Sequence, residues 1–309
     1  IMRKQHSLSI ILSLAALLVS ANALAQSKPS QAMQDVKYLA SEAMQGREIG
    51  STGNALAREY IIKRITDLGL KPCGDNYVHE FKVNTLKQAN VGKNILACQY
   101  TKENPAAKYL VVSAHYDHVG VNNNKIYFGA DDNASGVAGV LAVAQSMKDT
   151  ATKHHIVYAF FDGEERGLLG AHAFVKQDMI PRKDIAANLN FDMIARGDKN
   201  ELFISGAHHN PAFKSILDNV NNNKAANSIQ VLFDHDRPEQ GSNDWTPQSD
   251  HYAFFKVGIP HLYFGVEDHA DYHKPTDTFE KINPQFFDAC IEFLKLAVKR
   301  VDQQFTRKN

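Results

Sequence analysis

Three mostly apolar runs, each followed by residues that can bind a metal ion or a proton, constrain the fold of this chain most strongly. They cover residues 109–114, 156–161 and the segment that ends at Phe191. Short apolar runs of this kind are typical of strands buried in a parallel sheet. Open α/β sheets place their functional groups beyond the carboxyl ends of such strands, so we expect the residues after the three runs to meet at one edge.

One set of candidate metal ligands and bases comes from these runs, from the segment GADDNASG and from a polar loop near the C-terminus. It consists of two histidines, two aspartates and two adjacent glutamates: His115, Asp131, Glu164, Glu165, Asp192 and His273. A hydrolase with two metal ions needs a carboxylate that touches both ions, a terminal carboxylate and an imidazole for each ion, and a free carboxylate as base. The six residues fill these places with none missing.

Each piece also has an ordinary structural explanation on its own. A His-x-Asp sequence occurs in surface loops, Asp131 stands where a helix N-cap is expected, and a Glu-Glu pair suits a solvated turn. His273 is explained equally well as a solvated loop histidine. Asp192 is harder to explain in this way, because an aspartate among Phe191 and other apolar neighbours is costly unless it is paired or metal-bound. The prediction of a metal site therefore depends on the combination.

The alternation of apolar runs with amphipathic segments predicts one α/β domain, with a mixed, mostly parallel central sheet and helices on both faces. We expect helices near residues 31–44, 55–68, 136–148 and 284–303. Strands are expected near residues 78–83, 94–100, 109–114 and 260–264. No segment before His115 or after the last strand is long enough for a second domain.

The chain carries, in this order, His-x-Asp, Gly-Ala-Asp-Asp-Asn-Ala-Ser-Gly, Glu-Glu, Phe-Asp-Met and His-x-x-x-Asp-Thr. This order resembles the co-catalytic di-zinc aminopeptidases, peptidase family twenty-eight of the metallopeptidases. The resemblance runs from about Val36 to the C-terminus and implies the zinc-dependent exopeptidase-like fold. Glutaminyl cyclases belong to the same superfamily.

The resemblance implies two zinc ions per chain and a role for each ligand. Asp131 would bridge the ions, with Glu165 and His273 on one ion and His115 and Asp192 on the other. A water that bridges the ions would lose its proton to the general base, Glu164, and attack the first peptide bond. The donor set leaves other divalent metals open.

Two further geometric features are expected around these ligands. Asp117, two residues after His115, is expected to accept the second imidazole N–H of His115 and so to fix its tautomer. The family also suggests a cis peptide bond between Asp131 and Asp132.

Residues 1–25 are predicted to be a signal peptide and residues 26–309 the metallopeptidase domain. Two basic residues precede an apolar run, and Ala23-Leu24-Ala25 matches the small-x-small cleavage pattern. We therefore expect an exported, periplasmic or secreted protein without stable membrane insertion after cleavage. The leader holds two of the 34 basic residues and none of the 34 acidic ones, which leaves 32 against 34, a net charge of −2. No basic stripe suggests nucleic acid as a partner.

Cys73 and Cys98 could form a disulfide in an exported protein, and two reduced core cysteines remain the alternative. Cys290 is expected to be a buried free thiol.

The segment 242–264 is the expected specificity wall. By family resemblance Asp250 is a candidate for positioning substrate. The aromatic residues of the segment either line an apolar pocket or belong to the core: Trp245, Tyr252, Phe254 and Phe255. The remaining histidines of interest are expected to be surface or satisfied core residues: His118, His208, His209, His235, His251, His261 and His269.

These observations predict an aminopeptidase that acts on peptides with a free amino terminus. A carboxypeptidase needs a cation for the terminal carboxylate, and only Arg166 and Arg196 lie near a ligand in the sequence. Two alternatives remain: a glutaminyl cyclase-like acyltransferase with one zinc, and a non-catalytic binding protein on the same fold. The oligomeric state is not predicted.

Overall fold

The computed structural model describes residues 29–83, 91–177, 179–221 and 229–307. The expected signal peptide, residues 1–25, lies outside these described residues. Within them, no helix combines the length and the apolar character that a membrane span requires.

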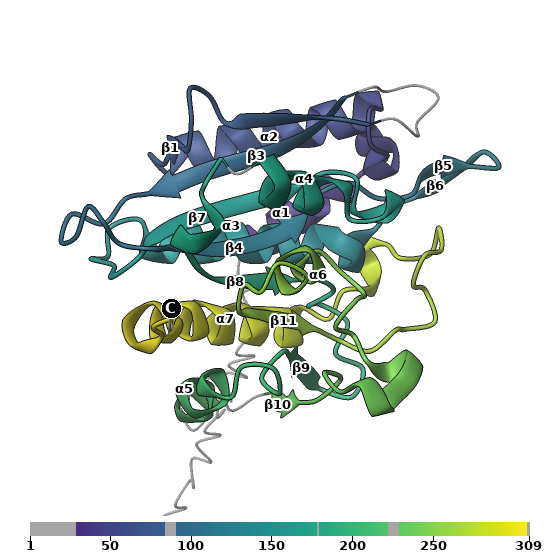
Figure 1. Ribbon diagram of the computed structural model, residues 1–309. Helices are drawn as coiled ribbons and strands as arrows, with labels where there is room; N and C mark the ends of the chain where they lie inside the picture. Colours follow the sequence, from purple (N-terminus) through teal and green to yellow (C-terminus); the bar gives the residue numbers. More distant parts are fainter. Residues whose placement is uncertain (1–28, 84–90, 178, 222–228, 308–309) are drawn as a thin grey trace, which may run out of the picture.

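One nine-stranded sheet forms the centre of the molecule (Figure 1). Its strands are β1 (Lys71–Pro72), β2 (Val78–Lys82), β3 (Val91–Gln99), β4 (Tyr109–His115), β7 (His155–Phe161), β8 (Ile185–Phe191), β9 (Glu201–Ser205), β10 (Gln230–Phe233) and β11 (His261–Gly265). The order is β1-β3-β7-β4-β8-β11-β9-β10, with β2 also paired to β3. The four middle strands, β7, β4, β8 and β11, run parallel, and antiparallel pairs join them to both flanks. The sheet is thus mixed with a parallel centre, as predicted.

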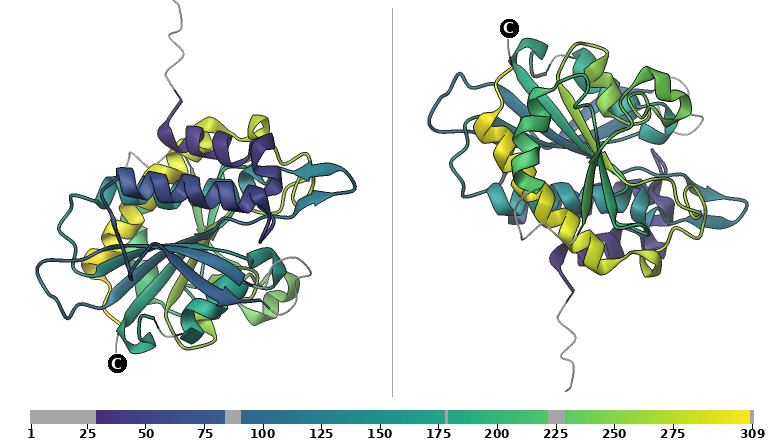
Figure 2. Two further views of the ribbon diagram at one scale, coloured as in Figure 1. Left: turned by 90° about the horizontal axis from the view of Figure 1, so that it is seen from above. Right: turned by 90° about the horizontal axis from the view of Figure 1, so that it is seen from below.

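Helices cover both faces of this sheet (Figures 1 and 2). The α-helices are α1 (Gln31–Leu39), α2 (Thr52–Asp67), α3 (Gly136–Met147), α4 (Leu169–Gln177), α5 (Ala212–Asn221), α6 (His251–Phe255) and α7 (Pro284–Gln304). In Figure 2, α1, α2 and α7 lie on one face, and α4 and α6 lie on the other. Each face has its own apolar core cluster, and the larger cluster lies under α1, α3 and α7.

Side-chain caps define where several helices begin. Ser30, Ser51 and Asn283 each accept a hydrogen bond from a backbone N–H in the first turn of α1, α2 and α7. The expected helix near residues 31–44 ends earlier, at Leu39, and a 3-10 turn (Glu42–Arg47) continues the chain. The backbone of Ser41 is extended, with φ −81° and ψ 161°, so the α-helix cannot continue through it.

The middle strands carry the buried character that the sequence predicted. Every residue of β7 and β8 is buried, as is every residue of β4 after Tyr109. These strands are hydrogen-bonded side by side, so their carboxyl ends lie at one edge. A separate hairpin, β5 (Gly120–Asn122) and β6 (Lys125–Tyr127), projects from the body at this end of β4 (Figure 1).

Cys73 and Cys98 form a disulfide that ties the segment after β1 to the end of β3. Their Cα atoms are 5.0 Å apart. Of the two alternatives that the sequence left open, the structure therefore has the bonded one. Cys290 is a buried free thiol on α7, as expected.

Candidate metal centre

The carboxyl ends of β4, β7 and β8 bring most of the predicted ligands together. His115 is the last residue of β4, Glu164 and Glu165 lie in a 3-10 turn after β7, and Asp192 follows β8 directly. The pairing of His115 with Phe161 aligns the ends of β4 and β7. The sheet thus places side chains from three distant parts of the sequence at one edge.

Asp132 lies in the middle of this group, and its two carboxylate oxygens face different partners. Oδ1 lies 3.4 Å from His115 Nε2, which is also 3.3 Å from Asp192 Oδ1. Oδ2 lies 3.1 Å from His273 Nε2, which is also 3.1 Å from Glu165 Oε2. One carboxylate therefore joins two sets of donors, each with one imidazole and one further carboxylate.

Asp131, the residue predicted to bridge, lies outside this arrangement. Its Oδ1 accepts a hydrogen bond from the Ala195 N–H at 2.7 Å, and its Oδ2 lies 3.2 Å from His269 Nε2. Successive side chains of an extended segment point in opposite directions, so only one of the two adjacent aspartates can face the ligands. Of the two, Asp132 therefore faces both sets of donors, and Asp131 faces Ala195 and His269.

The cis peptide bond is also displaced by one residue from the expectation. It joins Asp132 to Asn133, not Asp131 to Asp132. Asn133 then fixes the turn, because its amide donates to the Phe191 carbonyl and its Oδ1 accepts from the Gly136 N–H. The close approach explains Gly136, where a Cβ atom would lie 2.2 Å from Asn133 Oδ1.

Asp117 has a different contact from the one predicted. Its carboxylate accepts the backbone N–H groups of Glu164 and Glu165, at 3.0 and 3.4 Å. The Nδ1 of His115 instead pairs with the Asp117 backbone carbonyl at 3.2 Å, while the carboxylate is 3.7 Å away. Asp117 therefore orients His115 through its main chain and holds the glutamate turn with its side chain.

Opposite charges anchor the Asp132 loop from its two sides. The buried guanidinium of Arg47 donates to four carbonyl oxygens, those of Leu39, Tyr116, Phe128 and Gly129. On the other side, the Asp277 carboxylate accepts the N–H groups of both Asp131 and Asp132, at 3.0 and 3.1 Å. The sequence analysis missed Arg47 and gave Asp277 only as part of a motif, four residues after His273.

His118 is a second residue that the sequence analysis left without a role. It is buried, and its Nδ1 lies 2.7 Å from Glu165 Oε1 and 3.7 Å from Asp132 Oδ2. The signal that could have identified it is the sequence His-Tyr-Asp-His, which puts two histidines at the end of one buried strand. The structure thus adds a third imidazole to the candidate centre.

Burial and neighbouring charges perturb the acids of this site. Burial raises the pKa of Glu164 well above its usual range, the positive charge of His115 opposes the rise, and the carboxylates of Asp192 and Asp250 add to it. Asp250 is itself buried with no hydrogen bond to either oxygen from the described residues. Asp192 is held by Ser249, whose hydroxyl donates to Asp192 Oδ2 at 2.6 Å.

The expected specificity wall divides between core and surface. Trp245 and Phe254 are buried, and Trp245 packs on the rings of Phe203, His235 and Tyr263. Phe255 is 37% exposed and Tyr252 is half-buried, so only these two aromatic side chains are accessible.

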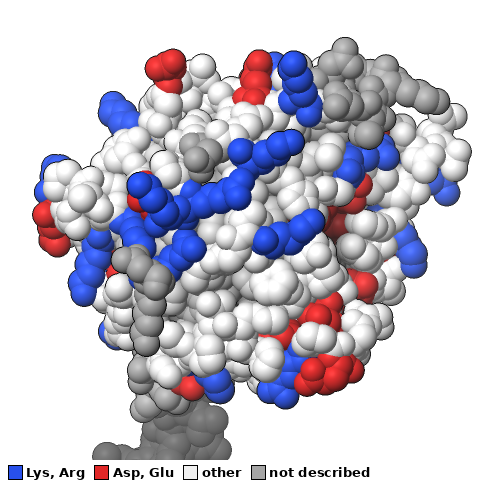
Figure 3. Space-filling model, in the orientation of Figure 1, with Lys and Arg blue, Asp and Glu red and all other residues white. Residues whose placement is uncertain are grey.

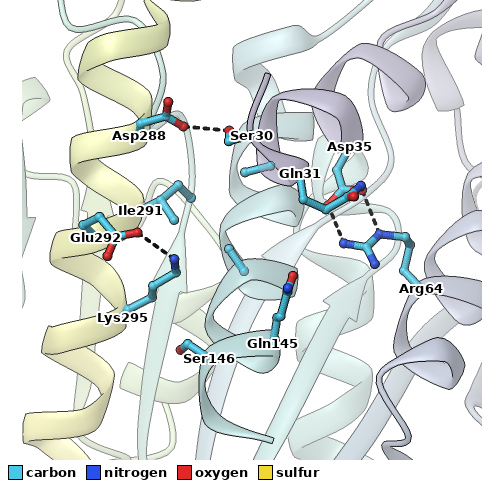
Figure 4. Close-up of a pocket in the computed structure, with 12 residues that line it drawn as sticks. Ser30, Gln31, Asp35, Arg64, Gln145, Ser146, Asp288, Ile291, Glu292 and Lys295 are labelled. Carbon is cyan, nitrogen blue, oxygen red and sulfur yellow. Dashed lines mark hydrogen bonds and ion pairs between the residues drawn. The ribbon is translucent and has the colours of Figure 1, made fainter. Parts of the chain in front are cut away.

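A cavity of about 620 Å³ lies elsewhere, between α1, α2, α3 and α7 (Figure 4). Its two cations are both paired, Arg64 with Asp35 and Lys295 with Glu292. None of the candidate ligands lines it. On the molecular face of Figure 3, basic and acidic side chains occur together, in keeping with the near-neutral composition.

Comparison with known proteins points to one family. The family model described as "Peptidase family M28" matches residues 94–298. Aminopeptidase YwaD of Bacillus subtilis is 27% identical over 221 residues, which cover 67% of this chain and 44% of that protein. The chain spans between 28% and 52% of the length of several curated relatives that it matches.

Solved structures share the fold at low sequence identity. BSAP, a zinc aminopeptidase from Bacillus subtilis, aligns with a TM-score of 0.71 at 16% identity, over 90% of this chain and 95% of that one. The glutaminyl cyclase of Porphyromonas gingivalis aligns with a TM-score of 0.69 at 16% identity, over 86% and 96%. The matched segment spans the three strand ends and His273, so the chain belongs to peptidase family M28.

Proposed function

We propose that this protein is a metal-dependent aminopeptidase that uses two zinc ions to remove N-terminal residues from peptides. The observation that carries the proposal is the position of Asp132, whose two oxygens face separate donor sets 3.1 to 3.4 Å away. We assign one ion to Asp132, His115 and Asp192, and the other to Asp132, Glu165 and His273. The bridging role given to Asp131 by resemblance passes to Asp132.

The donor atoms fit zinc. Zinc binds imidazole nitrogen and carboxylate oxygen at about 2.0–2.2 Å, which separates neighbouring ligands of a tetrahedral ion by about 3.3 Å. The contacts of His115 with Asp132 and Asp192, 3.4 and 3.3 Å, agree with this separation. In addition, the buried Glu165 Oε1 has no hydrogen bond from the described residues, and such an atom is costly without a partner. The first observation supports a cation beside His115, and the second supports a cation beside Glu165.

Bound zinc ions would supply Lewis-acid activation of the attacking water and of the substrate carbonyl. Glu164 is the residue that we assign to proton transfer from the water to the leaving amine. Asp117 keeps Glu164 in place, because it binds the Glu164 backbone N–H.

The charges around the site favour an amino terminus over a carboxylate. Arg166 pairs with Glu48, and Arg196 pairs with Asp271 at 2.9 Å, so the two arginines considered from the sequence are both engaged by acids. Several carboxylates remain at the centre, which suits a substrate ammonium group. This balance supports an exopeptidase that acts from the amino end.

The test is hydrolysis of matched peptide pairs with free and acetylated amino termini, after removal of metal and after addition of zinc. We expect zinc-dependent release of the first residue from free peptides alone. Cleavage of acetylated peptides from their carboxyl end would contradict the aminopeptidase assignment. A peptide with N-terminal glutamine tests the alternative suggested by the fold of glutaminyl cyclases, since cyclisation releases ammonia and leaves the peptide bond intact.

Export is part of the proposal. The Cys73–Cys98 disulfide supports an oxidising compartment, where such bonds persist. The expected mature chain begins at Gln26 or soon after, and N-terminal sequencing of the protein from its native compartment tests this. A chain that retains residues 1–25 would contradict cleavage.

A further inference from the structure

His118 is a buried imidazole whose ring nitrogens are both left without a hydrogen bond by the described residues. A buried polar group without a partner costs about 1–3 kcal/mol, so native structures rarely keep one without a reason. The ring packs against Gly129, where a Cβ atom would lie 2.5 Å from it. The backbone N–H of His118 is anchored to the Arg47 carbonyl at 3.3 Å. The side chain is therefore held in place by its surroundings, with Nδ1 facing the carboxylates of Glu165 and Asp132.

Nδ1 of His118 faces the carboxylates of Glu165 and Asp132, both of which we assign to one ion. It lies 2.7 Å from Glu165 Oε1, yet neither atom has an aligned hydrogen bond with any described residue. It is also 3.7 Å from Asp132 Oδ2. The His273 ring lies on the same side, with its centroid 5.9 Å from that of His118. Two imidazoles and two carboxylates thus surround one point.

The separations of these four donors approach those of a tetrahedral site. Nδ1 of His118 is 2.7 Å from Glu165 Oε1 and 3.7 Å from Asp132 Oδ2. Nε2 of His273 is 3.1 Å from the other Glu165 oxygen, Oε2, and 3.1 Å from the same Asp132 Oδ2. About 3.3 Å is expected between ligands of tetrahedral zinc. A cation at this point would pair both the Nδ1 of His118 and the Oε1 of Glu165, which have no hydrogen bond otherwise.

We propose that His118 is a fourth protein ligand of the ion held by Asp132, Glu165 and His273, so that the two metal positions differ. This inference rests on the proposed two-zinc function and extends it. The ion with His118 would have four protein donors, while the ion with His115 and Asp192 would have three. Closed four-ligand sites are typical of structural zinc, and three-ligand sites keep a position for water or substrate.

The test compares His118→Ala with His261→Ala in metal-free full-length protein titrated with zinc. His261 is a matched control, because it is fully buried and both its nitrogens also lack hydrogen bonds from the described residues, but it belongs to no candidate metal group. We expect His118→Ala to weaken one zinc site by more than about 100-fold and to leave the other unchanged. Loss of a residue that only supports a ligand costs about 10–100-fold. His261→Ala should keep both affinities.

The His118→Gln variant and the visible absorption of bound cobalt distinguish two roles for His118: a metal ligand, or a residue that only contacts the ligand Glu165. With cobalt in place of zinc, loss of an imidazole changes the visible absorption of the His118→Gln protein, whereas loss of a hydrogen bond to Glu165 leaves the band shape close to that of the parent. Addition of imidazole to His118→Ala should restore both the spectrum and the zinc affinity.

Unchanged affinities, or a decrease below 100-fold with an unchanged cobalt spectrum, would overturn the assignment of His118 as a ligand. If the parent protein itself binds fewer than two zinc ions, the proposed function fails, and this result is distinct from the former. Circular dichroism of the metal-free variants checks that each one folds.

Discussion

Two groups of buried histidines show how strongly the surroundings decide what the same side chain does. His115 and His118 lie at the carboxyl end of β4 and face carboxylates. His251 and His261 lie on α6 and at the start of β11, where they face aromatic rings and each other, with centroids 5.3 Å apart. All four are buried.

His115 of the first group and His261 of the second have pKa shifts of opposite sign. Burial alone lowers the pKa of a histidine, but at His115 the charges of Asp192 and Glu164 outweigh burial and raise the pKa well above its usual range. At His261 burial lowers the pKa to about 4, and the positive charge of His209 adds to the effect. Carboxylates therefore surround His115, whereas burial keeps His251 and His261 neutral.

We call the surroundings of His115 and His118 the charged region. Glu164→Gln tests this region and should have the largest effect, a loss of catalysis. This change removes the proposed proton acceptor and keeps the ligand atoms, so we expect peptide hydrolysis to fall about 100- to 10,000-fold with both zinc ions retained. Steady-state kinetics and metal analysis on the same sample measure this. Near-normal turnover would contradict the role of Glu164.

The adjacent aspartates provide the next comparison within the charged region. Asp132→Ala should lower zinc at both positions, because its two oxygens face both donor sets. Asp131→Ala should keep both ions and lower stability, since Asp131 accepts the Ala195 N–H. Metal content after gel filtration distinguishes the two variants. If Asp132→Ala retained two ions, the bridging role would return to Asp131.

Arg47→Met tests whether the charged region depends on its buried cation. The change leaves four buried carbonyl oxygens without their donor. At about 1 kcal/mol for each lost hydrogen bond, we expect a decrease on the order of 4 kcal/mol in the free energy of unfolding.

Arg307→Met is the matched control for Arg47→Met. Arg307 also donates to three backbone carbonyls, those of Arg182, Ile185 and Gly258, and these lie away from the strand ends that carry the ligands. Urea unfolding of metal-free protein should show a smaller loss for this variant. A loss as large as that of Arg47→Met would mean that the position of Arg47 is not special.

The surroundings of His251 and His261 form the neutral region, which His261→Phe tests in metal-free protein. The folded pKa of about 4 lies below the usual value of 6.5, so the unfolded state takes up a proton first. The contribution of neutral His261 to the free energy of unfolding is complete above pH 6.5. It is lost as the pH falls towards 4, which lowers the free energy of unfolding by about 3 kcal/mol at most. Unfolding free energies at pH 7 and pH 4.5 should differ less in His261→Phe. An equal pH dependence in both proteins would contradict this account.

The sequence by itself determined the family and the architecture. Mostly apolar runs are typical of strands covered on both faces of a parallel sheet, and β4, β7 and β8 form such a buried centre. The donors His115, Glu165, Asp192 and His273 were identified because each follows such a strand or belongs to the family pattern.

Only the tertiary structure decided which neighbour of each motif faces the centre. Asp131 and Asp132 are chemically identical, and the direction of each side chain depends on the adjacent Asn133 and on Arg47 and Asp277 from other parts of the fold. His118 likewise became visible only when the β7 turn placed Glu165 beside it. Spacing along a chain specifies which residues can meet, whereas the orientation of a side chain depends on backbone contacts between segments that are distant in sequence.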